Sequence, residues 1–283
     1  MNRIISKDRL AEGIVDLRVE APVIARKRKA GQFILLRIDE TGERIPLTIV
    51  DSNPEEGSIR LIIQEVGKTT YSLGELEAGD SIKDIAGPLG KATHIENFGT
   101  VVCIGGGIGV APVYPIAAAM KEAGNRVISI IGARNHDLMI MEEDMKKVSD
   151  RLVVATDDGS YGIHGFVTDA LQSLIDEGLK IDLVVAIGPV PMMKFTSLLA
   201  KKNNLPTIVS LNSVMVDGTG MCGGCRVSVG GKSKFVCVDG PEFDGHEVDY
   251  DELTMRQSAY HDMEKEAMDI YHKCKIGRDG EDK

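Results

Sequence analysis

The first hundred residues alternate short apolar runs with polar turns. The runs fall at residues 14–19, 33–38, 45–50, 59–64 and 81–85. Strands of this length, separated by turns, are typical of small antiparallel barrels. We therefore expect a β-barrel domain over residues 1–98.

The pattern changes at Thr100, where strands begin to alternate with helices. Strands are predicted at residues 101–104, 127–131, 152–156, 183–187 and 207–211, and helices at 166–175 and 191–200. This alternation predicts a parallel α/β sheet, which binds ligands at the ends of its strands. The second domain is expected over residues 99–212, which leaves a third, small domain at 213–283.

Three of the five cysteines gather in that third domain. Asp217 is followed by Cys222 and Cys225, and Cys237 comes after a gap of eleven residues. With Asp217 counted at the first position, the spacing is that of a plant-type [2Fe-2S] cluster in which one ligand is oxygen. Gly218, Gly220, Gly223 and Gly224 let the loop approach such a cluster closely. We interpret Asp217, Cys222, Cys225 and Cys237 as the metal ligands.

Other readings of these cysteines stay open. A zinc site is compatible with C-x2-C, and His246 would complete a Cys3His set, although zinc sites usually carry a second pair. A redox dithiol is expected early in a βαβ unit instead. Asp217 would, on a further alternative, only cap the loop.

Composition narrows the class of protein. The chain has 283 residues and a formal net charge of −10, which disfavours general nucleic-acid binding. The sequence offers neither an apolar run of transmembrane length nor a signal-peptide core, so we expect a cytoplasmic protein without membrane contact. The free cysteines fit a reducing compartment, and Cys103 is expected to be buried in a strand.

Two N-terminal segments carry candidate ligand contacts. Pro46 lacks a ladder donor, which confines its strand to an edge, a bulge or a ligand-facing groove. The planar guanidinium of Arg44 could pair with a pyrophosphate, and Thr48 could offer its hydroxyl to a ligand. The same segment would also be explained as an ordinary edge strand with a surface arginine. Thr69 and Thr70 begin a short predicted helix whose first amides would suit a phosphate.

A glycine turn directly follows the first strand of the α/β region. Residues 105–112 read Gly-Gly-Gly-Ile-Gly-Val-Ala-Pro, so Val110 replaces the last glycine of the strict dinucleotide fingerprint. Glycines and a helix start still suit a pyrophosphate. Arg134 stands where an acidic residue would hold a ribose, so the preference between NAD and NADP stays open. Loops at 157–160 and 188–193 end two further strands.

The order of these motifs resembles the ferredoxin-NADP reductase superfamily over almost the whole chain. The resemblance is carried by the segments Ala30-Gly-Gln-Phe33, 44–48, 67–70, Gly87-Pro-Leu-Gly90, 105–112, 188–193 and the cysteine cluster. More narrowly, the chain is similar to the electron-transfer subunits of dihydroorotate dehydrogenase B, sulfide dehydrogenase and the NADH-dependent reduced ferredoxin:NADP oxidoreductases. Asp217 and the acidic segment 250–276 favour the last group.

The resemblance implies FAD against the N-terminal domain, NAD(H) at the second and a [2Fe-2S] cluster at the third. It implies that FAD contacts Arg44, Ile45, Pro46, Leu47, Thr48, Leu61, Ile62, Ile63, Gly67, Thr69 and Thr70. It implies that NAD(H) contacts Gly107, Ile108, Gly109, Val110, Ala111, Pro112, Arg134, Asp157, Gly188, Pro189, Met192 and Met193.

The function implied is electron transfer between NAD(H), FAD and the cluster, in a heterodimer with a larger flavin and iron-sulfur subunit. That partner would handle ferredoxin and NADP, and the chain alone would show only diaphorase activity. Two alternatives remain: an electron-transfer subunit for dihydroorotate or sulfide chemistry, and a non-redox, zinc-bearing nucleotide-binding module.

Overall fold

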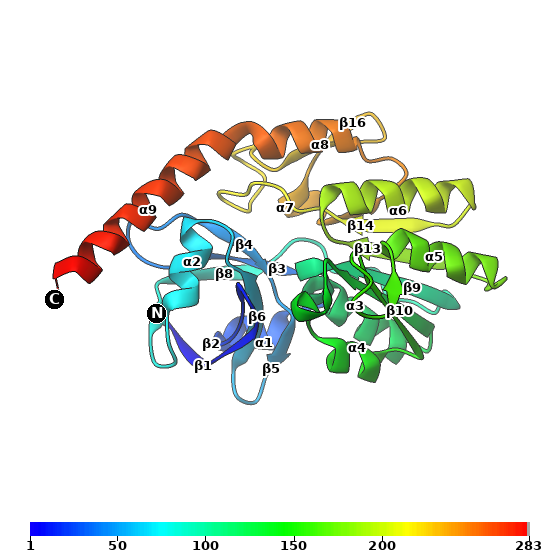
Figure 1. Cartoon of the computed structure of the whole chain (residues 1–283), viewed down its shortest axis with the longest axis horizontal. Coiled ribbons are helices and arrows are strands. Elements are labelled where there is room, and N and C mark those ends of the chain that lie inside the picture. Colours follow the sequence, from blue (N-terminus) through cyan, green and yellow to red (C-terminus); the bar gives the residue numbers. More distant parts are fainter. Residues whose placement is uncertain (282–283) are drawn as a thin grey trace.

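The computed structural model describes residues 1–281, with side chains as far as residue 271. The N-terminal strands, the large sheet and the cysteine-containing segment form three neighbouring parts (Figure 1). Residues 282 and 283, which end the third predicted domain, lie outside the described residues. None of the described helices is long and apolar enough to cross a membrane.

The N-terminal part contains two antiparallel sheets, with strand orders β5-β6-β2-β1-β7 and β4-β3-β8. The strands are β1 (Asn2–Ala11), β2 (Ile14–Glu20), β3 (Phe33–Arg37), β4 (Ile45–Thr48), β5 (Asp51–Asn53), β6 (Ser58–Gln64), β7 (Ser81–Ile82) and β8 (Asp84–Leu89). Two short helices, α1 (Pro22–Lys27) and α2 (Lys68–Glu75), lie between them. The sheets enclose one apolar core that includes Ile34, Leu36, Leu61 and Ile63.

The closed barrel predicted from the sequence is a point of correction. The strands are antiparallel as expected, but the described residues form two sheets instead of one closed one. The chain crosses from one sheet to the other at Ile49 and Val50, which are 0% and 1% exposed. The Ile49 amide still donates to Gln32 O beside β3, whereas the Val50 amide donates to Arg60 O of β6. The pairing partner therefore changes between these two residues, so β4 ends at Thr48 and β5 begins at Asp51.

Strand β1 is absent from the sequence prediction. Of its ten residues only Ile4 is buried, so it lacks the alternating apolar signal of a half-buried strand. The strand forms because it pairs along its length with β2 across a turn that contains Gly13, whose φ is +69°. Backbone pairing, not side-chain pattern, therefore determines this element.

The second part is a seven-stranded sheet in the order β12-β11-β10-β9-β13-β14-β17, parallel except for β17. Its strands are β9 (Thr100–Gly106), β10 (Arg126–Ala133), β11 (Arg151–Thr156), β12 (Ile163–His164), β13 (Leu183–Ile187), β14 (Thr207–Ser210) and β17 (Glu242–Asp244). Its helices are η1 (Gly107–Gly109), α3 (Val110–Glu122), η2 (His136–Leu138), α4 (Glu142–Val148), α5 (Val167–Asp176) and α6 (Val190–Lys202). The predicted parallel sheet is confirmed, and Cys103 is fully buried in β9.

The cysteine-containing part is small and contributes to the core of the large sheet. It holds β15 (Arg226–Val229), β16 (Lys232–Phe235), α7 (Val236–Asp239), α8 (Tyr250–Gln257), η3 (Ser258–Tyr260) and α9 (His261–Glu281). Cys225 and Cys237 belong to the same buried cluster as Phe33 and Leu35 of β3. Helix α9 runs from this part back towards α2 (Figure 1), where Tyr271 donates a 2.6 Å hydrogen bond to Glu75.

Glu242 lies where the three parts meet. Its Oε1 accepts a 2.5 Å hydrogen bond from Thr93 Oγ1, in the segment between β8 and β9. A Cβ atom added to Gly31 would lie 2.3 Å from that hydroxyl and 2.5 Å from the carboxylate. Burial raises the pKa of Glu242 to about 7, and the hydrogen bond from Thr93 offsets only part of this effect.

Replacing Glu242 with Gln should flatten the dependence of stability on pH. The folded-state pKa lies above the unfolded one, so the wild type loses stability as pH rises from about 4.5 to 7. The free energy of unfolding of the variant, taken relative to that of the wild type, should be up to about 3 kcal/mol higher at pH 8 than at pH 5. Denaturant titrations at both pH values measure this, and an equal difference at each would contradict the burial argument.

Candidate cofactor sites

The glycine turn after β9 packs tightly against the neighbouring strand β13. A Cβ atom on Gly109 would lie 2.2 Å from the carbonyl oxygen of Ile187, and one on Gly105 would lie 2.7 Å from Cα of Val110. Only glycine allows these backbone approaches. The turn feeds directly into η1 and α3, so the predicted pyrophosphate segment stands at the carboxyl end of the sheet, as in open α/β folds that bind nucleotides.

Other predicted NAD(H) residues reach the same edge from adjacent strands. Arg134 and Asp157 follow β10 and β11, which are neighbours, and the Asp157 amide donates to Ala133 O at 3.1 Å. Both side chains are exposed. Asp158 is held by Ser160, whose amide and hydroxyl donate to its Oδ1 at 2.9 and 2.7 Å. These hydrogen bonds lower the pKa of Asp158.

The two methionines of the last predicted segment differ in position. Met192 lies over the turn, since a Cβ atom on Gly106 or Gly188 would lie 2.3 or 2.8 Å from its Sδ. Met193 is 0% exposed and packs in the core. Val110 and Ala111 are also buried, at 1% each. The structure thus brings 107–112, Gly188, Pro189 and Met192 together, while Met193, Val110 and Ala111 can contribute only backbone atoms.

The predicted FAD residues lie on three segments, and two of them, at β4 and at the start of α2, contact each other. Strand β4 is an edge strand paired with β3, with Pro46 opposite Leu35, as the missing N–H of proline requires. Thr69 Oγ1 donates to Glu43 Oε2 at 2.9 Å and so joins the start of α2 to the start of β4. Arg44 is exposed beside them.

The start of α2 suits an anionic group. Gly67 caps the helix and the Thr70 hydroxyl accepts from the amides of Val66 and Gly67 at 3.0 Å. The amides of the first helical turn have no acceptor within a helix, and no acidic residue occupies that turn. The predicted hydroxyl of Thr70 is therefore used for capping, and the free donors are backbone amides.

Strand β6 presents two different faces. Leu61 and Ile63 are 0% and 1% exposed and fill the N-terminal core, so only their backbone is open to a ligand. Ile62 points the other way and packs in the cluster that contains Val110 and Ala111 of α3. The N-terminal sheet thereby abuts the glycine turn of the second part.

The cysteine loop lies against the N-terminal part. A Cβ atom on Gly218 would lie 2.8 Å from Leu35 of β3 and 2.9 Å from Leu89 of β8. Cys225 Sγ lies 3.2 Å from Cys237 Sγ, and the Cys237 amide points at Cys225 Sγ at 3.5 Å. Burial and the neighbouring sulfur raise the pKa of the Cys237 thiol to about 12.

The other two predicted ligands form a second pair. Asp217 Oδ2 accepts from the Cys222 amide and Oδ1 from the Thr219 amide, each at 2.9 Å. The hydrogen bond from Thr219 is the main cause that lowers the pKa of Asp217. Cys222 is exposed, and the Gly224 amide points at its sulfur at 3.5 Å. The carboxylate therefore caps the loop in this structure.

The donor set fits an iron-sulfur cluster better than a single metal ion. Among residues with described side chains, no three His, Cys, Asp or Glu groups are arranged around one metal position. The protein ligands of a [2Fe-2S] cluster are divided between its two irons, so two pairs are the arrangement expected. Amides aimed at two of the sulfurs and glycines with positive φ at 218, 220 and 223 agree with this.

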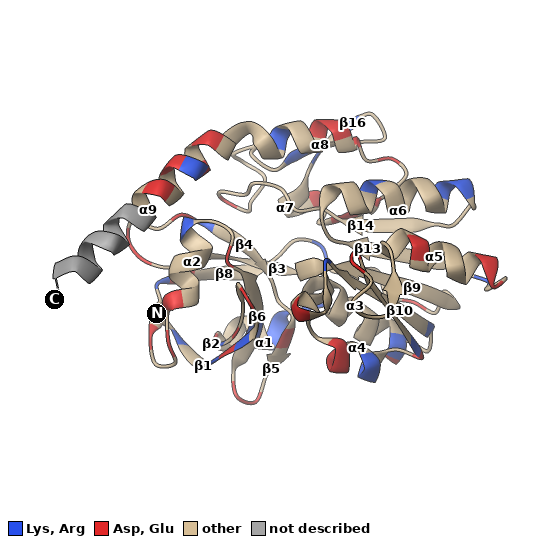
Figure 2. Cartoon of the chain, in the orientation of Figure 1, with Lys and Arg blue, Asp and Glu red and all other residues tan. Residues whose placement is uncertain are grey.

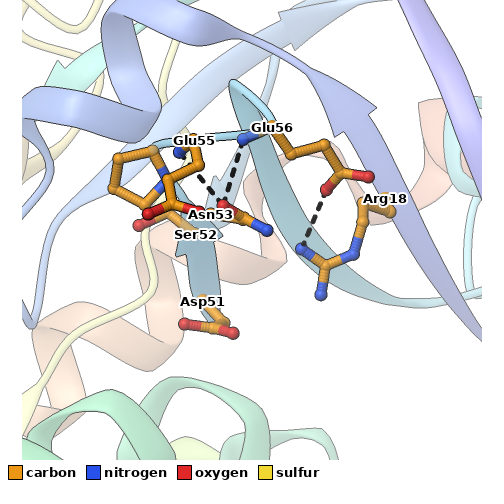
Figure 3. Close-up of a pocket in the computed structure, with 7 residues that line it drawn as sticks. Arg18, Asp51, Ser52, Asn53, Glu55 and Glu56 are labelled. Atoms are coloured by element: carbon orange, nitrogen blue, oxygen red, sulfur yellow. Dashed lines mark hydrogen bonds and ion pairs between the residues drawn. The ribbon is translucent and has the colours of Figure 1, made fainter.

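His246, the fourth ligand of the zinc alternative, lies elsewhere. It lines a hollow of about 230 Å³ between α6 and the segment 245–251, together with Lys194 and Tyr250. A larger hollow of about 680 Å³ lies at the turn between β5 and β6 and is lined by Arg18, Asp51, Glu55 and Glu56 among others (Figure 3). Its carboxylates disfavour phosphate, and none of the predicted site residues lines it.

Comparison with known proteins agrees with this geometry. Residues 212–249 match the iron-sulfur cluster binding domain of dihydroorotate dehydrogenase B, and residues 103–198 match the oxidoreductase NAD-binding domain. A "dihydroorotate dehydrogenase B (NAD(+)), electron transfer subunit homolog" of Thermotoga maritima is 50% identical over 94% of this chain and 93% of its own. The electron transfer subunit of Geobacillus thermodenitrificans is 32% identical over 87% and 96%.

Solved structures give the same result. A chain of the NADH-dependent reduced ferredoxin-NADP oxidoreductase, studied for flavin-based electron bifurcation, is 48% identical and superimposes with a TM-score of 0.91 over 96% of this chain and 98% of its own. The cytochrome P450 reductase GcoB of Amycolatopsis, 21% identical with a TM-score of 0.61, shares the fold.

The chain is an oxidoreductase subunit with a ferredoxin reductase-like fold, an NAD-binding domain and an iron-sulfur cluster binding domain. It belongs to the family of dihydroorotate dehydrogenase B electron-transfer subunits and their homologues. The sequence resemblance is thereby confirmed, and the zinc-bearing module is not supported.

A glycine in the turn can be required by lack of space for a Cβ atom or by a positive φ. The substitutions Gly109→Ala and Gly107→Ala should separate these two reasons. Gly109 has an ordinary φ of −62° but no room for a Cβ atom, whereas Gly107 has φ +56° and open space. Gly109→Ala should cost about 3 kcal/mol through overpacking and shift the turn, and Gly107→Ala about 1 kcal/mol. Denaturant unfolding measures both; equal costs would show that the approach to Ile187 is not limiting.

Proposed function

We propose that this chain passes electrons between NAD(H), FAD and a [2Fe-2S] cluster, and exchanges them with a larger subunit in a bifurcating ferredoxin:NADP oxidoreductase. One observation carries the proposal: the nucleotide edge and the cysteine loop both contact the N-terminal part. Strand β6 contacts η1, and its Ile62 shares a buried cluster with Val110 of α3, while Gly218 lies against Leu35 and Leu89. A flavin on the N-terminal part would lie between the other two sites.

Each of the three predicted domains, 1–98, 99–212 and 213–283, would bind one of the three redox groups. Residues of β4 would hold the flavin, with Arg44 at its pyrophosphate and the first amides of α2 at a phosphate. The turn at 107–112 would bind the nicotinamide nucleotide, and Met192 would lie near its ring. Bound flavin accepts a hydride from a nicotinamide and passes on single electrons. The residues of this chain position and shield those groups.

The cluster would be held by two pairs of ligands. Cys225 and Cys237, whose sulfurs lie 3.2 Å apart, would share one iron. Asp217 and Cys222, joined through the Cys222 amide, would share the other. This second pair of ligands is the one open to solvent, because Cys222 is exposed. Val216 and Met221, 53% and 88% exposed, flank this pair and form an apolar rim suited to a partner subunit.

A role in dihydroorotate oxidation is the second candidate. It is favoured by the relatives named as dihydroorotate dehydrogenase B electron transfer subunits at 32% identity and by the Thermotoga chain named as a homolog of that subunit at 50%; the identity to the bifurcating oxidoreductase chain is 48%. Co-purification decides between them: a partner with a second flavin and further clusters supports the first role, and a TIM-barrel flavoprotein supports the second. A cytoplasmic location is proposed with it, because a cluster needs cysteines in their thiolate form, which a reducing compartment maintains.

The purified full chain should contain FAD and iron and should reduce ferricyanide with NADH. Cys222→Ser should lose the cluster but keep this activity, because flavin and nicotinamide suffice for it. Metal analysis, absorption spectra and steady-state rates test the prediction. A colourless protein that contains zinc, without iron or flavin, would exclude the proposed function.

Replacing Asp217 with Cys tests the oxygen ligand. If Asp217 binds iron, the variant should keep its cluster but show a changed electron paramagnetic resonance spectrum and midpoint potential. Asp239→Ala is the matched control, because Asp239 accepts a 2.8 Å hydrogen bond from the Phe235 amide near Cys237 without being a predicted ligand. A spectrum and potential unchanged in Asp217→Cys would show that Asp217 only caps the loop.

A further inference from the structure

Arg60 connects the N-terminal sheet to the nucleotide-binding part. Its Nε and Nη2 bind Asp16 Oδ2 of β2 at 2.8 and 2.7 Å, and its Nη1 donates to Asp144 Oδ2 of α4 at 3.0 Å. The three side chains are 14–28% exposed. One guanidinium therefore spans the boundary between the two parts, with a carboxylate on each side.

The bridge stands on the same face of β6 as the contact with the glycine turn. Side chains two residues apart point to the same side of a strand, so Arg60 and Ile62 both face the second part. Ile62 belongs to the same buried cluster as Val110 and Ala111 at the start of α3, and β6 contacts η1 directly before them. An apolar contact alone allows one sheet to rotate against the other, whereas a second, directional contact at Asp144 restricts that rotation.

Asp144 is firmly attached to the nucleotide edge. Helix α4 connects β10 to β11, the strands that end at Arg134 and Asp157, and it packs against α3. Besides Arg60, the described partner of Asp144 is Lys147, at 3.7 Å on the same helix. Burial lowers the pKa of Arg60, but hydrogen bonds with Asp16 and Asp144 outweigh this and raise it, so the guanidinium stays charged.

We propose that Arg60 and Asp144 position the NAD(H) edge against the flavin and so set the rate of hydride transfer between them. The inference rests on the proposed function. Hydride transfer needs the reacting atoms at about 3–3.5 Å, and a misplacement of about 1 Å can cost 100-fold in rate. A bridge remote from both rings can therefore control the chemistry without contacting either cofactor.

The test is stopped-flow reduction of the flavin by saturating NADH in the full chain with its cofactors. Arg60→Met and Asp144→Asn should each slow this step at least tenfold, and the double variant should be no slower than Arg60→Met, because both act through one contact. Arg60→Lys should be intermediate, since one ammonium cannot replace the fork that joins both carboxylates. Flavin content and NADH affinity should stay within twofold of wild type.

Arg151→Met is the matched control. It removes a pair with Glu177, at 2.6 and 2.9 Å, that lies entirely within the second part. It should leave flavin reduction unchanged even where its melting temperature falls. Rates for Arg60→Met and Asp144→Asn equal to that control, or effects that add in the double variant, would overturn the positioning role. A wild type whose flavin NADH does not reduce would instead refute the proposed function.

Discussion

The approach of two backbones at Gly109 is the constraint on which the other sites depend. Where a Cβ atom would come within 2.2 Å of the Ile187 carbonyl, the chain after β9 turns immediately into α3. That turn brings Val110 and Ala111 into the buried cluster that also contains Ile62 of the N-terminal sheet. A single missing methyl group thus determines both the shape of the nucleotide edge and the place where the flavin-bearing part meets it.

The parallel sheet and the cysteine loop were readable from the sequence because each has a local signal. Apolar strands alternating with helices predicted β9, β10, β11, β13 and β14 but not the two-residue β12, and the spacing of Asp217 to Cys237 predicted the cluster segment. The closed barrel was wrong, because the change of pairing partner between Ile49 and Val50 is a tertiary feature that short apolar runs do not reveal. Strand β1 was missed because backbone hydrogen bonds with β2 hold it in place, and such pairing requires no alternating apolar pattern in its side chains.

Within the sites, the sequence named segments better than single side chains. Leu61, Ile63 and Met193 belong to predicted segments, yet their side chains fill cores. Arg60 was not singled out, because an arginine in a strand gives no sign that its partner is 84 residues away. The signal that could have found it is the alternation along β6, in which Arg60 and Ile62 share the face opposite to the core.

Charged residues are distributed differently over the three parts of the molecule. Acidic side chains lie along α8 and the described part of α9, including Asp251, Glu252, Asp262 and Glu264 (Figure 2). At the nucleotide edge, Arg134 and Asp157 offer one charge of each sign. On α2 the helix start supplies partial positive charge beside Lys68, its first residue. Backbone amides and a basic side chain therefore favour an anion together at the start of α2.

The exposure of Cys222 has a consequence for the handling of the protein. Its sulfur lies at the surface on a glycine loop, whereas Cys225 and Cys237 are covered. Dioxygen and peroxide reach an accessible sulfur first, and each oxidised form beyond the sulfenic acid is lost to metal binding. With Cys222 as a ligand, its oxidation would limit the durability of the cluster in air, and a partner subunit bound at the apolar rim of Val216 and Met221 would protect it from oxygen.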